Sequence, residues 1–160
     1  MHFVPCFVYT VLDDRYFRGQ AYVLAEERLE GNFTKWNNNA GKVLLSPGKS
    51  LSLGAIGEDD ENDSENDGDD FVNQVPRCFS HFTYIQSNRK QLVCDLQGVW
   101  NAAIGFTLTD PVIHYNSSRG RRHVNGSTDK GSDGMRKFFE THKCGKLCQK
   151  LGLPRVVLSF

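Results

Sequence analysis

The chain has 160 residues, of which 39% are hydrophobic and 24% are charged, a composition typical of one globular domain. No run of about 18 apolar residues occurs, so the sequence predicts neither a membrane span nor a membrane partner. Its five cysteines form an odd and unevenly spaced set, which argues against a disulfide framework. We therefore expect a cytoplasmic protein with thiols available for a metal.

The formal net charge is zero, but the two signs are unevenly distributed. Residues 58–70 hold nine of the 19 acidic side chains and no basic one, so the rest of the chain carries a formal charge of +9. A basic body suits phosphate-bearing ligands. Nucleic-acid binding is disfavoured, because the basic residues are not interleaved with aromatic ones. The acidic run predicts a solvated, disordered insert over residues 57–70.

Two strands are predicted at the start of the chain, over residues 3–12 and 20–26, where β-branched and aromatic side chains are frequent. A turn at Asp13 and Asp14 separates them. The polar stretch 31–41 contains three consecutive asparagines, which favour turns.

The back half of the sequence is more regular. Apolar residues recur at helical spacing from Val75 to Ile85, and Asn88 ends this predicted helix. Residues 91–97 are predicted to form one buried strand. A flexible glycine-rich loop over residues 126–134 precedes a second helix, which Ser132 or Asp133 can cap.

Two corners carry carboxylates. In a strand that runs to Gln97, the side chains of Asp95 and Gln97 point to the same side, which suits Mg²⁺ held against phosphate. The alternative for Asp95 is a turn-capping role. Thr109, Asp110 and Pro111 form the second corner, where the proline favours an extended Asp110 and a plain turn is the simpler interpretation. Together, the two carboxylates would allow the metal-holding and proton-accepting roles of phosphoryl transfer.

The glycine-rich segment matches neither a Walker A loop nor the dinucleotide fingerprint. It is either a simple loop before a helix or a set of backbone N–H groups that bind an anion.

A metal-ligand cluster follows. His142, Cys144 and Cys148 fall within seven residues, and a helical turn would aim both thiols the same way. Zinc usually takes four such ligands, so one is missing. Five residues are candidates for the fourth position: His81, Cys78, Cys94, His114 and His123.

The motifs occur in an order that resembles the alpha-type (atypical) protein kinases, the family of myosin heavy chain kinase, elongation factor 2 kinase and the TRPM-channel kinase domains. The similar segments are Val23–Gly31, Lys35–Gly41, Phe79–Tyr84, Val93–Val99, Leu108–Pro111, Gly126–Gly131 and Phe138–Cys148. The resemblance covers about residues 20–154. It implies an α+β fold, namely the C-terminal catalytic lobe of such a kinase with an integral structural zinc and a remnant of the N-terminal lobe sheet.

The resemblance also implies site residues. His81 would complete the zinc site with the three C-terminal ligands. Asp95 and Gln97 would hold Mg²⁺ and phosphate, Asp110 would accept the proton of a protein Ser or Thr hydroxyl, and Asp95 would have a direct catalytic role as well. ATP would also be contacted by Glu26, Glu27, Leu29, Lys35, Thr109, Gly126 and Gly131.

Two departures from the family pattern stand out. Residues 99–107 exceed the spacing of well-known members and are expected to form a longer loop. No lysine precedes Glu26, whereas the family has a glycine-rich strand and an ATP-gripping lysine there. We therefore expect residues 1–30 to be a remnant of the N-terminal lobe and hinge, and residues 31–160 the catalytic lobe. The alternative to a truncated Ser/Thr kinase is an inactive, zinc-stabilised pseudokinase or phosphoprotein-binding module.

Overall fold

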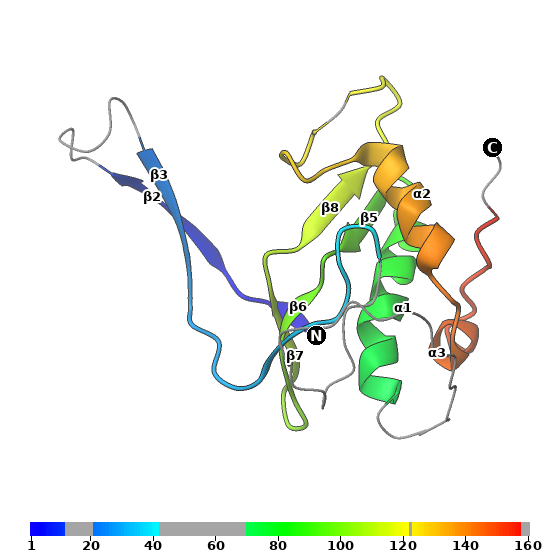
Figure 1. Ribbon diagram of the computed structural model, residues 1–160, viewed down its shortest axis with the longest axis horizontal. Coiled ribbons are helices and arrows are strands. Elements are labelled where there is room, and N and C mark those ends of the chain that lie inside the picture. Colours follow the sequence, from blue (N-terminus) through cyan, green and yellow to red (C-terminus); the bar gives the residue numbers. More distant parts are fainter. Residues whose placement is uncertain (12–20, 42–69, 122, 158–160) are drawn as a thin grey trace, which may run out of the picture. The chain divides into compact units, whose positions relative to one another are not determined.

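The computed structural model describes residues 1–11, 21–41, 70–121 and 123–157 (Figure 1). The strands are β1 (His2–Phe3), β2 (Cys6–Val11), β3 (Ala21–Glu26), β4 (Phe33–Lys35), β5 (Gln91–Cys94), β6 (Gln97–Asn101), β7 (Gly105–Thr109) and β8 (Val112–Tyr115). The helices are α1 (Asp70–Gln86), α2 (Gly131–Thr141) and α3 (Lys146–Lys150). The chain forms two compact units, the first from residues 1–33 and 98–109 and the second from residues 34–97 and 110–160.

In the first unit, β2 and β3 form an antiparallel ladder from Cys6 opposite Glu26 to Val11 opposite Ala21. Both predicted strands are therefore confirmed, although Val4 and Pro5 separate β1 from β2. The predicted turn at Asp13 and Asp14 lies outside the described residues. Side chains on both faces of this hairpin are exposed: Phe7, Tyr9 and Val23 on one, Val8, Tyr22 and Leu24 on the other.

The prediction of a longer loop over residues 99–107 is wrong, because most of this segment is paired strand. β6 and β7 are neighbours, and β1 pairs in parallel with the far side of β7. Between β6 and β7 the Asn101 side chain accepts the N–H of Ala103 at 2.8 Å, a local bond that supports the tight turn.

Gly98 allows β6 to approach β7. Its φ is +149°, and a Cβ placed there would lie 2.1 Å from the carbonyl oxygen of Thr107. We expect Gly98→Ala to destabilise the protein by roughly 2–4 kcal/mol, since backbone atoms must shift. Urea unfolding would measure this, with Gly120→Ala as the control. Gly120 also has positive φ, at +63°, but a Cβ at that position would meet nothing within 4 Å. Equal losses in the two variants would contradict the steric argument.

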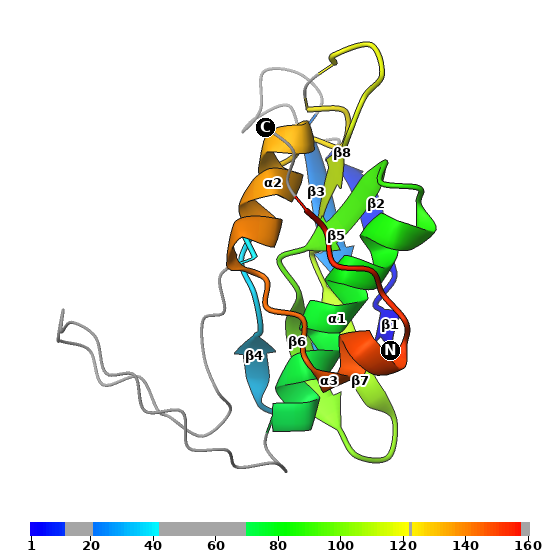
Figure 2. The same cartoon turned by 90° about the vertical axis from the view of Figure 1, so that its right-hand side faces the viewer.

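In the second unit, β5 and β8 pair in antiparallel fashion, α1 packs on β5 and α3, and α2 packs on β8 (Figure 2). The buried core is formed by Leu92, Cys94, Val112, Met135 and Phe138. The predicted helix over 75–85 is confirmed and is longer at its start.

Several local expectations are corrected. The predicted strand 91–97 is two strands, because the positive φ of Asp95, 58°, ends β5 at Cys94. The polar stretch 31–41 includes a short strand, β4. The second helix begins within the loop predicted as flexible, at Gly131, and its N-cap is Lys130 without a side-chain capping bond. Of the acidic insert 57–70, only Asp70 lies within the described residues, where α1 begins.

Candidate functional site

Asp95 and Asp110 lie just beyond the same end of the β5–β8 ladder. The last pair of that ladder joins Cys94 to Val112, so Asp95 follows one strand and Asp110 precedes the other by one intervening proline. Both aspartates have a left-handed backbone, with φ of 58° and 46°. The expectation that Pro111 keeps Asp110 extended is therefore wrong. Aspartate tolerates this conformation better than most residues, and such strained positions are concentrated at functional sites.

A loop that follows β4 contacts the residues around Asp95. The Lys35 ammonium lies 2.8 Å from an Asp95 carboxylate oxygen. The Trp36 N–H donates to the Leu96 carbonyl at 2.9 Å, and the Asn37 side chain accepts the Leu96 N–H at 2.8 Å. The backbone beyond Asp95 is therefore bonded on both its N–H and its C=O. Gln97, half-buried, begins β6 rather than continuing β5.

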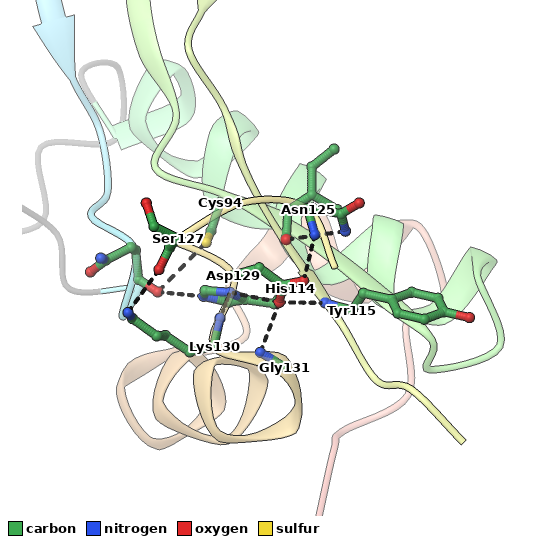
Figure 3. A network of polar contacts seen from close by, with 10 residues as sticks. Cys94, His114, Tyr115, Asn125, Ser127, Asp129, Lys130 and Gly131 are labelled. Carbon is green, nitrogen blue, oxygen red and sulfur yellow. Dashed lines mark hydrogen bonds and ion pairs between the residues drawn. The ribbon is translucent and has the colours of Figure 1, made fainter. Parts of the chain in front are cut away.

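The glycine-rich segment is organised by a buried carboxylate. Asp129, 1% exposed, accepts the N–H groups of Tyr115, Gly131 and Asn125 at 2.8–3.0 Å (Figure 3). Burial acts to raise the pKa of Asp129, but these three N–H groups outweigh it and hold the pKa below its usual range. Gly126 lies exposed at a turn, whereas Gly131 is the buried first residue of α2.

Four metal-ligand side chains come together beside α1. One ligand atom from each of His81, His142, Cys144 and Cys148 lies within 4.8 Å of the others. The Nδ1 of His81 is 3.8 Å from the Cys144 sulfur, and the Nε2 of His142 is 3.8 Å from the Cys148 sulfur. These spacings are close to the edges of a tetrahedron with arms of about 2.0 Å to nitrogen and about 2.3 Å to sulfur.

Outer contacts orient this group. The Nε2 of His81 donates to the Pro154 carbonyl at 3.1 Å, which leaves Nδ1 unprotonated on the side of the thiols. Burial, with smaller contributions from His81 and Arg77, lowers the pKa of His142 to about 4. Two neutral imidazoles and two cysteine sulfurs, which bind as thiolates, are the donor set that zinc prefers, so these residues could hold a zinc ion.

The other candidates for the fourth zinc ligand have different positions. His114 and Cys94 both contact the carbonyl of Asn39, His114 at 2.8 Å. Cys78 is buried close to Cys148, and burial raises the pKa of its thiol to about 12. His123 lies exposed, with a positive φ of 56°.

Four of the residues expected to contact ATP belong to the first unit, namely Glu26, Glu27, Leu29 and Thr109. The Thr109 hydroxyl donates to the Glu26 carboxylate, so the structure brings these two together. Glu27 is exposed and Leu29 half-buried after β3.

Two residues of the second unit were not predicted from the sequence. Asn37 was only one of three asparagines, and Asp129 was one polar residue in a glycine-rich loop. What marks both residues is the burial of a polar side chain, with 0% and 1% exposure, and sequence spacing does not reveal this burial.

Comparison with known proteins identifies the family. The alpha-kinase family pattern matches residues 1–148, so the chain belongs to the alpha-kinase family. It is 32% identical over 152 residues to alpha-protein kinase vwkA of Dictyostelium discoideum, and 36% identical over 132 residues to myosin heavy chain kinase B of the same organism. These matches cover 95% and 82% of the chain but only 20% and 13% of the two relatives.

The fold agrees with this assignment. The crystal structure of the alpha-kinase domain of myosin-II heavy chain kinase A in complex with AMP-PNP matches with a TM-score of 0.69 and 29% identity. The match covers 98% of this chain and 47% of that one, so the chain spans about half of the solved domain. The α+β fold expected from the resemblance is thus confirmed. No helix among the described residues is long and apolar enough to cross a membrane.

Proposed function

We propose that the chain is the C-terminal catalytic part of a protein Ser/Thr kinase of the alpha type, which transfers the γ-phosphate of ATP to a protein hydroxyl. The observation that carries this proposal is the position of Asp95 and Asp110, both with a left-handed backbone conformation, at one end of the β5–β8 ladder. Phosphoryl transfer needs one group to hold metal against phosphate and another to accept the hydroxyl proton. Asp95 and Asp110 supply both at adjacent strand ends.

The proposed roles follow from the chemistry of each side chain. Asp95 and Gln97 offer the oxygen ligands that Mg²⁺ prefers, and Mg²⁺ would neutralise phosphate charge there. Lys35, which pairs with Asp95, is assigned as a positively charged contact to the phosphate groups. Asp110, exposed beyond β7, accepts the proton of the substrate hydroxyl. The remaining nucleotide contacts are assigned to Glu26, Glu27, Leu29, Thr109, Gly126 and Gly131.

The four-residue His and Cys group is proposed as a structural zinc site. All four ligands come from protein, which leaves no open position for a reactant. His81 lies on α1, His142 and Cys144 follow the end of α2, and Cys148 lies on α3. Zinc would therefore tie α1 to the C-terminal helices.

The domain limits and the location of the protein belong to the same proposal. Residues 1–30 are assigned to the N-terminal lobe and hinge, and residues 31–160 to the catalytic lobe. The described cysteines are all free thiols, which favours the cytoplasm.

Calorimetric titration of the zinc-loaded chain with Mg-ATP tests the proposal. We expect saturable binding heat in the wild type and none in Asp95→Ala, because that variant loses the carboxylate that holds the metal. Asp133→Ala is the matched control, since it removes an exposed carboxylate from the first turn of α2 and should bind normally. Equal binding by wild type and Asp95→Ala would refute the assignment of Asp95.

A second candidate function rests on the coverage of the solved domain. Because the match covers only 47% of the solved chain, this sequence spans about half of a domain that holds AMP-PNP in that structure. A pseudokinase or phosphoprotein-binding module is therefore the alternative. It predicts a folded, zinc-loaded chain that binds a phosphopeptide but gives no heat with Mg-ATP.

A further inference from the structure

Two loops that are far apart in the sequence meet at one imidazole. His114, on β8, is fully buried. Its Nε2 donates to the carbonyl of Asn39 at 2.8 Å, and its Nδ1 accepts the N–H of Lys130 at 3.1 Å (Figure 3). Since Nδ1 accepts a hydrogen bond, the ring is the neutral Nε2–H tautomer. Its 4.0 Å approach to Asp129 is therefore not an ion pair.

The first loop is the glycine-rich segment from Asn125 to Gly131. Asp129 binds its two ends, because one carboxylate oxygen accepts the N–H of Asn125 and the other accepts the N–H of Gly131. His114 adds the N–H of Lys130 between them. The conformation of the segment is thus fixed by two buried side chains, while its tip from Gly126 to Thr128 stays exposed.

The second loop runs from Lys35, the last residue of β4, to Asn39. It is bonded to both sides of Asp95: Lys35 pairs with the carboxylate, and Asn37 accepts the N–H of Leu96. The thiol of Cys94 donates to the same Asn39 carbonyl that His114 contacts. A displacement of Asn39 would therefore be transmitted to the residues that flank Asp95.

Helix α2 locks the imidazole in place. A Cβ added at Gly134 would lie 2.4 Å from the His114 Nε2, so the helix backbone packs directly against the ring. Tight packing leaves the ring one orientation, in which both nitrogens are already bonded.

We propose that His114 and Asp129 are positioning residues that hold the glycine-rich segment and the Lys35–Asn39 loop as one frame around Asp95. The inference rests on the proposed nucleotide site, and neither residue is assigned a contact with substrate. Its consequence is that phosphate affinity depends on two buried groups behind the site, because small misplacements of a site cost large factors in function.

Two substitutions of His114 each remove the hydrogen bond to one loop and keep the bond to the other. In His114→Gln, the amide nitrogen can take the place of Nε2 and keep the bond to Asn39, while the bond to Lys130 is lost. In His114→Asn, the amide oxygen can take the place of Nδ1 and keep the bond to Lys130, while the bond to Asn39 is lost. Asp129→Asn is a third, milder variant that can keep two of the three N–H bonds.

Amide hydrogen exchange measures how firmly each loop is held, and it needs no bound nucleotide. We expect His114→Gln to speed exchange at Lys130 by at least about tenfold with little change at Leu96. His114→Asn should do the reverse, with faster exchange at Leu96 and at Ala40, whose N–H donates to the Asn38 side chain. Uniform acceleration throughout the second unit in both variants would overturn the proposal and indicate a general structural role. If both His114 variants fail to fold, Asp129→Asn is tested in their place. It should speed amide exchange at Asn125 and leave exchange at Leu96 nearly unchanged, whereas equal acceleration at both would overturn the proposal.

Mg-ATP affinity is the second readout. Each variant should bind about tenfold or more weakly at a temperature where it is folded and zinc-loaded. Tyr84→Ala, which removes a half-buried ring packed on Phe139, is the matched destabilised control and should keep its affinity. If a variant exchanges faster in one of the two loops but binds Mg-ATP as tightly as the wild type, the proposal is overturned. If wild type binds no nucleotide, the proposed function fails, and the exchange pattern still decides whether the frame exists.

Discussion

Replacing Cys148 with Ser is expected to unfold the second unit at room temperature, and a strong zinc chelator should do the same to the wild type. Cys148 is 2% exposed and lies in α3, which packs on α1. A structural zinc contributes on the order of 10 kcal/mol of apparent free energy, as much as the whole stability of a typical domain. Circular dichroism melting and zinc content would be measured together.

Cys6→Ser is the control for this experiment, because Cys6 is an exposed thiol on β2 in the first unit. It should change neither the melting temperature nor the zinc content. A Cys148→Ser protein that melts like the wild type would show that the four-residue group is not a structural metal site.

Zinc affinity should rise with pH. Burial raises the pKa of the Cys144 thiol, so this group is protonated at neutral pH in the metal-free protein and zinc must displace its proton. His142, whose burial lowers its pKa to about 4, carries no competing proton above that pH. Affinity should therefore increase by about tenfold or more per pH unit between about pH 6 and 8. Competition with a chromophoric chelator would measure this, and a flat profile would contradict it.

Asp110→Asn should strongly slow phosphoryl transfer and leave Mg-ATP binding intact. The amide keeps the shape of the side chain but cannot accept the hydroxyl proton, so kcat should fall by about 10²–10⁴-fold. Radiolabelled phosphate transfer to a Ser/Thr-containing protein would be compared with calorimetric nucleotide affinity, in a protein that contains this chain together with the rest of its kinase domain.

Asp133→Asn provides the matched control, an exposed aspartate on α2 with no proposed role. A fall in nucleotide affinity equal to the fall in rate would indicate that Asp110 binds metal instead of accepting a proton. Full activity of Asp110→Asn would remove it from the mechanism.

The spacing and type of apolar residues in the sequence correctly predicted several helices and strands. Apolar spacing located α1, and β-branched and aromatic residues located β2 and β3, because these patterns follow directly from which side chains leave water. The family was predicted from several short motifs in order, and the fold followed from it. The sequence could also propose His81 as a partner of the C-terminal ligands only through that resemblance.

The features that were missed depend on backbone conformation and long-range bonds. A positive φ at Asp95 splits one predicted strand into two, and aspartate adopts that conformation too rarely for a pattern to indicate it. The role of Asp129 depends on three N–H groups, one of them from β8, 14 residues away in sequence. Such bonds form only after the strands have paired, so local propensity contains no signal for them.

The hairpin of β2 and β3 also has a practical consequence. Within the described part of the chain, β2 and β3 form a two-stranded sheet of their own, so neither has a second strand along its outer edge. Apolar side chains such as Phe7 and Leu24 are 58% and 70% exposed on its opposite faces. Open edges with apolar faces are the template on which strands of other molecules add. Concentrated samples of this chain are thus expected to aggregate through β2 and β3, and a lysine at position 8 or 24 should delay precipitation.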